Sequence, residues 1–94
     1  MQTNSIAIVD EVGNKFWLLD DLYHRLDGPA VELYNGVKEW HLNGKLHRVD
    51  GPAIDFPNGH KEWWLDGKRH REDGPAVENS SKIKEWFLKL MAFL

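Results

Sequence analysis

Histidine, arginine and aspartate recur together along this chain, in a pattern that suits acid–base or metal chemistry. The three copies are His24-Arg25-Leu26-Asp27, His47-Arg48-Val49-Asp50 and His70-Arg71-Glu72-Asp73. A His and an Asp three residues apart are close enough to form a catalytic pair. Such a pair still needs a nucleophile and an oxyanion hole, and neither accompanies it here. We therefore predict no catalytic residue and a chain that is not an enzyme.

The same spacing argues against a metal site. Each repeated unit is expected to contribute two β-strands about 4.8 Å apart, so that equivalent histidines lie roughly 10 Å from each other. Zinc ligands must each come within about 2.1 Å of one ion. We predict neither a metal nor a cofactor. Instead, we expect each imidazole to pack on a tryptophan and to hydrogen-bond the backbone or the aspartate of the adjacent corner.

These copies belong to a repeat that spans most of the chain. Trp17, Trp40, Trp63 and Trp86 follow one another at intervals of 23 residues, and the histidines and the Asp-Gly-Pro segments keep the same interval. A fixed period of this length is typical of a stacked repeat fold. The sequence therefore predicts one domain, residues 1–94, with units at 7–29, 30–52 and 53–75 and a truncated unit at 76–94.

Within a unit the local signals favour β-hairpins. Asn43-Gly44 and Asp66-Gly67 lie between alternating apolar residues and are typical of two-residue turns, because their residues tolerate a positive φ. Asn35-Gly36 and Asn58-Gly59 predict the same turn at the other end of each strand, and Asp20-Asp21 predicts a weaker one. The expected cross-strand pairs of the second unit are Leu42 with Lys45, Trp40 with His47, Glu39 with Arg48, Val31 with Trp40, and Leu33 with Lys38.

The Asp-Gly-Pro segment of each unit predicts a bend. Proline removes a donor from the strand ladder and restricts the residue before it. We expect Gly51 to adopt a backbone conformation that is closed to residues with a Cβ atom. Repeated bends of this kind curl an open meander. The predicted fold is therefore all-β, a single curled antiparallel sheet of about four hairpins whose tryptophan face closes on itself.

The repeated residues resemble MORN-type repeats, whose unit of similar length carries W-x-x-G-x-x-H and hairpins closed by glycine. They resemble more closely the short H-R-x-D-G-P-A repeat proteins of bacteriophages and large DNA viruses, and the matching segments here are 24–30, 47–53 and 70–76. The first resemblance implies a hairpin repeat with a scaffolding or attachment role. The second implies a small viral protein and, in its sharpest version, an inhibitor of bacterial antiviral defence of the anti-CRISPR kind.

The composition excludes several classes of function. A net charge of −3 does not suit a nucleic-acid binder. The absence of cysteine excludes disulfides and thiolate metal sites, and it favours an intracellular location. No stretch approaches the roughly 20 apolar residues of a membrane-spanning helix. We expect a cytoplasmic protein without a membrane partner, in the host cytoplasm if the chain is viral.

Arginine and aromatic side chains are the candidate partner-binding residues. The predicted register gives Arg48 a glutamate as its cross-strand partner. The equivalent partner of Arg25 is Phe16, so we expect Arg25 to be free to bind a carboxylate or a phosphate. We also expect an exposed aromatic row made of Tyr34, His41, Trp64 and Phe87. Aromatic residues and arginine dominate binding hot spots, which makes this row a natural contact surface.

Two functions remain open from these residues. The first is a non-catalytic protein-binding module that blocks or scaffolds a host or viral protein. The second is a binder of a small anionic ligand or nucleotide, held between arginine and aromatic side chains. A flat aromatic patch favours the first function, and a concave pocket with converging arginines favours the second.

The last residues of the sequence carry a separate prediction. They are strongly apolar and fit either a strand in register with the repeat or a helical cap. On a monomer, such an apolar surface beside an unpaired strand edge favours association. We therefore predict a homodimer whose contact residues are Leu88, Leu90, Met91, Phe93 and Leu94.

Overall fold

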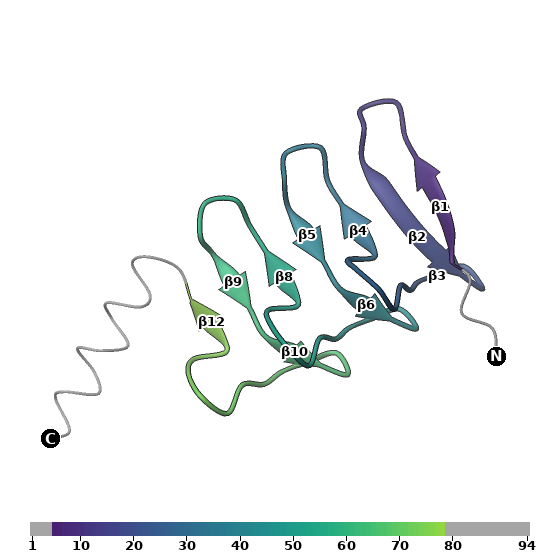
Figure 1. Cartoon of the computed structure of the whole chain (residues 1–94). Coiled ribbons are helices and arrows are strands. Elements are labelled where there is room, and N and C mark those ends of the chain that lie inside the picture. Colours follow the sequence, from purple (N-terminus) through teal and green to yellow (C-terminus); the bar gives the residue numbers. More distant parts are fainter. Residues whose placement is uncertain (1–4, 79–94) are drawn as a thin grey trace, which may run out of the picture.

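The computed structural model describes residues 5–78, and all regular structure in this range is β-strand (Figure 1). Within the same range no helix is long and apolar enough to cross a membrane. The strands are β1 (Ile6–Val9), β2 (Lys15–Leu19), β3 (Leu22–Tyr23), β4 (Val31–Glu32), β5 (Lys38–Glu39), β6 (His41–Leu42), β7 (Lys45–Leu46), β8 (Ile54–Asp55), β9 (Lys61–Glu62), β10 (Trp64–Leu65), β11 (Lys68–Arg69) and β12 (Val77–Glu78).

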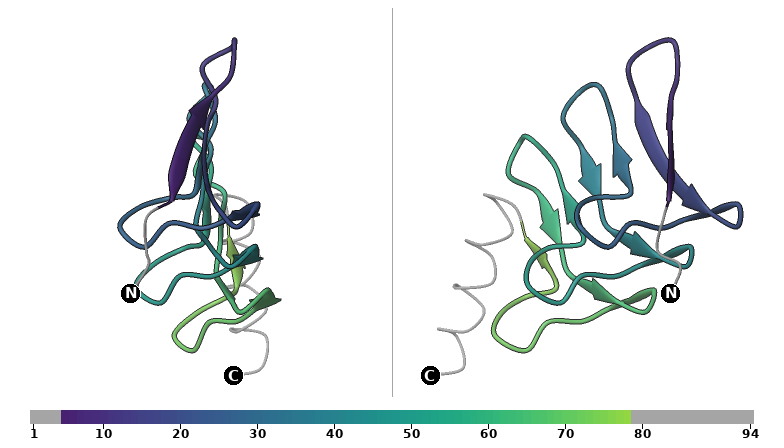
Figure 2. Two further views of the ribbon diagram at one scale, coloured as in Figure 1. Left: turned by 90° about the vertical axis from the view of Figure 1, so that its right-hand side faces the viewer. Right: turned by 45° about the vertical axis from the view of Figure 1, so that its right-hand side comes forward.

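The main sheet is an antiparallel meander of hairpins that lie side by side. Its strand order is β1-β2-β4-β5-β8-β9-β12, and β3 pairs with β2. The tip hairpins β6–β7 and β10–β11 form two further two-stranded sheets, so the strands are not all in one sheet as predicted. The edge-on view of Figure 2 shows the tip hairpins and the Asp-Gly-Pro corners projecting from the main sheet in opposite directions.

The tip hairpins confirm the predicted two-residue turns. Leu42 pairs with Lys45, and the residues of Asn43-Gly44 have φ values of 51° and 81°. Asp66-Gly67 has φ values of 50° and 77°. Asp20-Asp21 makes the same kind of turn without a glycine, at 52° and 65°. Aspartate and asparagine enter this left-handed region more readily than other residues with a Cβ atom.

The other end of each hairpin differs from the prediction. The observed pairs are Val31 with Glu39 and Glu32 with Lys38, in place of Val31 with Trp40 and Leu33 with Lys38. The loop has three residues instead of two, because the Leu33 N–H donates to the Val37 carbonyl at 2.9 Å. This register buries Val37, which is 6% exposed. The same three-residue loop closes the first and third hairpins, where Asn14 and His60 stand in place of Val37, and only the glycine of each loop has a positive φ. This is the pattern of a three-residue hairpin loop that ends in a left-handed glycine.

The observed register gives the main sheet two different faces, since cross-strand neighbours share a face and successive residues alternate. We call the face with Trp17, Trp40 and Trp63 the clamp face. It also carries a row of alternating charges, namely Lys15, Glu32, Lys38, Asp55, Lys61 and Glu78. We call the other face the reverse face; its row is Ile8, Phe16, Val31, Glu39, Ile54, Glu62 and Val77.

The buried apolar residues of the described range are small, namely Ala30, Val31, Val37 and Ala53. Ala30 and Ala53 are 0% exposed, and their carbonyls accept the N–H groups of Trp17 and Trp40 at 2.8 and 2.7 Å. The tryptophan side chains themselves are only half-buried. A single sheet has no second layer to cover them, so each depends on a side chain from its own unit.

Candidate binding surface

Each Asp-Gly-Pro corner holds an arginine over the ring of a tryptophan. The pairs are Arg25 on Trp17, Arg48 on Trp40 and Arg71 on Trp63, with 3.8, 3.8 and 3.7 Å between the arginine Cζ and the ring centroid. In every copy the arginine Nε donates to the aspartate two residues later, and Nη1 donates to the proline carbonyl four residues later. We call this arrangement the arginine clamp.

The clamp corrects two predictions about the arginines. Arg48 bonds Asp50 within its own corner, and Glu39 is not its partner. Arg25, which was expected to be free, also donates to Glu32 at 3.3 Å, and its side chain is only 23% exposed. The bend causes both differences, because it returns the guanidinium over the indole of its own unit. There, cation–π contact and charge-assisted hydrogen bonds hold it.

The clamp also explains the glycine of each corner. Gly51 was expected to have a backbone conformation that residues with a Cβ atom cannot adopt. This prediction is wrong, because its φ is not positive. A Cβ atom at this position would instead lie 2.9 Å from the Cζ of Arg48, and the equivalent glycines show the same distance to their own arginines. Any side chain at this position would therefore displace the guanidinium, which passes directly over the backbone.

Two histidines link neighbouring units. The Nδ1 atom of His24 accepts the Asn43 N–H, and that of His47 accepts the Asp66 N–H, each at 3.0 Å. The predicted hydrogen bond to the backbone or the aspartate of the adjacent corner is wrong, because the donor is the backbone of the tip turn in the next unit. Within residues 5–78, no three His, Asp or Glu side chains gather closely enough to hold a metal ion.

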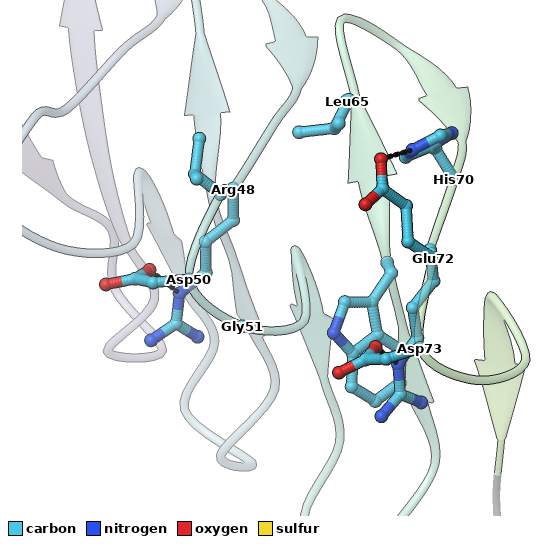
Figure 3. Close-up of a pocket in the computed structure, with 10 residues that line it drawn as sticks. Arg48, Asp50, Gly51, Leu65, His70, Glu72 and Asp73 are labelled. Atoms are coloured by element: carbon cyan, nitrogen blue, oxygen red, sulfur yellow. Dashed lines mark hydrogen bonds and ion pairs between the residues drawn. The ribbon is translucent and has the colours of Figure 1, made fainter.

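Successive corners form the walls of two equivalent grooves on the clamp face. The first lies between the corners of Asp27 and Asp50, with a cavity volume of about 770 Å³. The second lies between the corners of Asp50 and Asp73, with a volume of about 680 Å³. Figure 3 shows the second groove with one Arg–Asp pair on either side of it. Between the walls, Trp40 and Leu42 of the β5–β6 segment line the first groove, and Trp63 and Leu65 of the β9–β10 segment line the second.

The rims of the grooves present carboxylates and apolar side chains. The side chains of Asp27, Asp50 and Asp73 are each 87% exposed, and that of Glu72 is 90% exposed. Leu26 and Val49 are 59% and 82% exposed. The clamped arginines lie beneath these groups, with 19–25% of their side chains exposed. The surface that a partner would meet is therefore acidic and apolar, and its cationic groups are recessed and paired.

The structure does not assemble the predicted aromatic row. Tyr34 is 69% exposed, but it lies in the loop between β4 and β5, at the opposite end of the hairpin from β6 (Figure 1). His41 is buried, at 8% exposure, and Trp64 is half-buried. The remaining predicted contacts lie outside the described residues, namely Phe87 and the dimer residues Leu88, Leu90, Met91, Phe93 and Leu94.

Hydrogen bonds within the reverse face explain why these side chains are withdrawn. His41 Nε2 lies 2.9 Å from a Glu39 carboxylate oxygen. Glu62 accepts a hydrogen bond from Trp64 Nε1 at 2.9 Å and lies 2.8 Å from His60 Nε2. Burial raises the pKa of Glu62, but these hydrogen bonds and the nearby positive charges lower it by more, so its pKa lies below the ordinary value.

Sequence reasoning missed the groove rims, and above all Leu26 and Val49. The signal that points to them is the third position of the H-R-x-D-G-P motif, which varies from Leu to Val to Glu while its neighbours stay fixed. A position that the clamp does not use is free to face a partner.

Comparison with known proteins identifies no relative, since no family model, no curated protein and no solved structure matches this chain.

Proposed function

We propose that this chain is a non-catalytic protein-binding module that docks a segment of a partner protein on the grooves of its clamp face. The observation that carries the proposal is that the groove recurs. Both copies lie between two Asp-Gly-Pro corners, and each is lined by the equivalent tryptophan and leucine of its unit. Equivalent grooves in neighbouring units suit a ligand that extends over several units. A polypeptide has this property, and a small molecule does not.

The proposal includes a finer description of the fold, as an array of about four MORN-like hairpin units that curls at its corners. The arginine clamp supports it, because the same stacking and the same hydrogen bonds recur at intervals of 23 residues. The fourth unit, the curl, the viral origin and the host target stay predictions. So do the homodimer and the cytoplasmic location.

The state of the arginines favours a protein partner over a small anionic ligand. Each guanidinium already donates to an aspartate and to a proline carbonyl, and Arg25 and Arg71 donate to a glutamate as well. An anion entering a groove would meet the exposed carboxylates of the rim before it reached these groups. Displacing the internal partners would also break the clamp.

Selection from a displayed random-peptide library against the full chain tests the proposal. The discriminating variant is Val49→Lys, because Val49 lines both grooves and is 82% exposed, so the fold does not depend on it. The matched control is Val12→Lys, at an apolar residue that is 59% exposed in the loop between β1 and β2. We expect selected peptides to bind Val49→Lys about tenfold more weakly or worse, a loss of at least about 1.4 kcal/mol, and to bind the control like the wild type.

Calorimetric titration of the selected peptides provides the measurement. Failure to enrich any peptide, or enriched peptides that bind both variants alike, would refute the proposal. Parallel titrations with inorganic phosphate and nucleotides examine the other function. Saturable binding of these anions that Val49→Lys strengthens would favour an anionic ligand in the grooves.

A further inference from the structure

The meander sets a fixed distance between equivalent points of the clamp face. Two strand spacings separate β2 from β5 and β5 from β9 in the order of the sheet. At about 4.8 Å for each spacing, equivalent groups of neighbouring units are roughly 10 Å apart. A polypeptide that uses both grooves in the same way must therefore repeat its own side chains at about this distance.

This distance matches one regular backbone conformation. A polyproline II segment has three residues per turn and rises about 3.1 Å per residue, so equivalent side chains recur about every 9.3 Å. On an extended β-strand the side chains of one face recur about every 6.8 Å and fall out of step by the second groove. We infer, on the basis of the function proposed above, that the grooves bind a polyproline II segment with a basic residue at every third position.

The backbone of the groove supports this choice over an added β-strand. The Trp40 N–H donates to the Ala53 carbonyl at 2.7 Å, and the Trp40 carbonyl accepts the His47 N–H at 3.0 Å. A strand laid in the groove would thus find no unpaired ladder groups at this point. A polyproline II segment needs none, because its backbone is solvated and its recognition depends on packing against aromatic side chains.

The charges of the rim select basic side chains. Asp27, Asp50 and Asp73 recur once per unit, and each uses one carboxylate oxygen to accept its own arginine. Their side chains are 87% exposed, so they remain accessible to a second cation. Leu26 and Val49 directly precede Asp27 and Asp50, and their exposed side chains provide apolar surface for proline rings. The acid recurs in every described unit, whereas the apolar group occurs in the first two and is replaced by Glu72 in the third. This pattern predicts prolines with a basic residue at every third position.

Fluorescence anisotropy with labelled synthetic peptides and the full chain tests this inference. The ligand is a peptide of repeated Pro-Pro-Arg, long enough to span both grooves. The first control is repeated Gly-Ser-Arg, which keeps the charges and their sequence spacing but has no polyproline preference. The second is repeated Pro-Pro-Glu. We expect saturable binding of Pro-Pro-Arg, binding of Gly-Ser-Arg weaker by about tenfold or more, and no binding of Pro-Pro-Glu.

The variants show where the peptide binds. Val49→Lys adds a positive charge at the shared wall of the two grooves and should weaken Pro-Pro-Arg binding by about tenfold, whereas Val12→Lys should leave it unchanged. Equal binding of Gly-Ser-Arg, or tighter binding of a helical peptide with a basic residue at every seventh position, would overturn the inference. If Pro-Pro-Arg fails while library-selected peptides still lose binding in Val49→Lys, the inference falls and the proposed function stands. If neither the Pro-Pro-Arg peptide nor the library-selected peptides lose binding in Val49→Lys, the inference and the proposed function are both refuted.

Discussion

The clamp face and the reverse face repeat to very different degrees. On the clamp face, tryptophan, arginine, aspartate and glycine recur in every described unit, and the stacking distance changes by no more than 0.1 Å between 3.7 and 3.8 Å. On the reverse face, Phe16 is replaced by Glu39 and Glu62 in the following units, and Leu18 by His41 and Trp64. Two faces of the same strands thus obey different constraints.

The number of contacts that a side chain must satisfy at once explains the difference. A clamped arginine needs an indole face, a carboxylate, a carbonyl and a glycine beneath it, and its planar guanidinium fits them in only one arrangement. A glutamate on the reverse face needs only a donor. Glu39 finds it in a histidine two residues later, and Glu62 finds donors on both sides. Positions with several adequate partners are free to vary.

Among substitutions that test the difference between the two faces, we expect the largest change in stability at Gly51. We predict that Gly51→Ala lowers the free energy of unfolding by about 1–3 kcal/mol, because the new Cβ atom overlaps the guanidinium of Arg48. In an Arg48→Ala background the same substitution should cost much less. Denaturant unfolding of the single and double variants gives the coupling. An equal cost in both backgrounds would mean that the glycine is needed for a reason other than the clamp.

A smaller effect distinguishes the clamps from one another. Arg25 reaches Glu32, whereas the equivalent residue beside Arg48 is the shorter Asp55, which bonds Lys61 at 2.9 Å instead. We predict a coupling of about 0.5–1 kcal/mol between Arg25 and Glu32 in a double-mutant cycle of unfolding free energies, and none between Arg48 and Asp55. Similar couplings in the two cycles would show that the outer carboxylate belongs to every clamp.

The smallest effect concerns the pH dependence of the reverse face. Because the pKa of Glu62 is lower in the folded chain than the unfolded value of about 4.3, its ionised form stabilises the fold above that value. This contribution is lost as the pH falls through the folded pKa. We predict that Glu62→Gln flattens the decline of the melting temperature between about pH 5 and pH 3.

Glu11→Gln provides the control for this measurement, since Glu11 is exposed in the loop between β1 and β2. Its melting temperature should decline with falling pH as the wild type does. If the melting temperature of Glu62→Gln falls with pH as steeply as that of the wild type, the loss of stability in acid originates at other carboxylates, for example those of the clamp face.

The sequence by itself determined the features that depend on adjacent residues. The period of 23 residues, the all-β class and the tip turns at Asn43-Gly44 and Asp66-Gly67 follow from local backbone preferences and from side-chain alternation. Even the Asp20-Asp21 turn keeps the same left-handed conformation. A turn whose two central residues both require a positive φ leaves the chain few alternatives.

Only the tertiary structure decided the features that depend on distant residues. Asn35-Gly36 has the same composition as Asn43-Gly44 but closes a three-residue loop, in which Leu33 pairs with Val37 and only the glycine has a positive φ. The composition of the pair does not by itself choose between the two kinds of turn. The arginine clamp likewise became visible only once the corner had placed each guanidinium over its own indole. The grooves need two corners from neighbouring units side by side. Local preferences fix the hairpins, but contacts between them decide which side chains are buried, which are held and which face a partner.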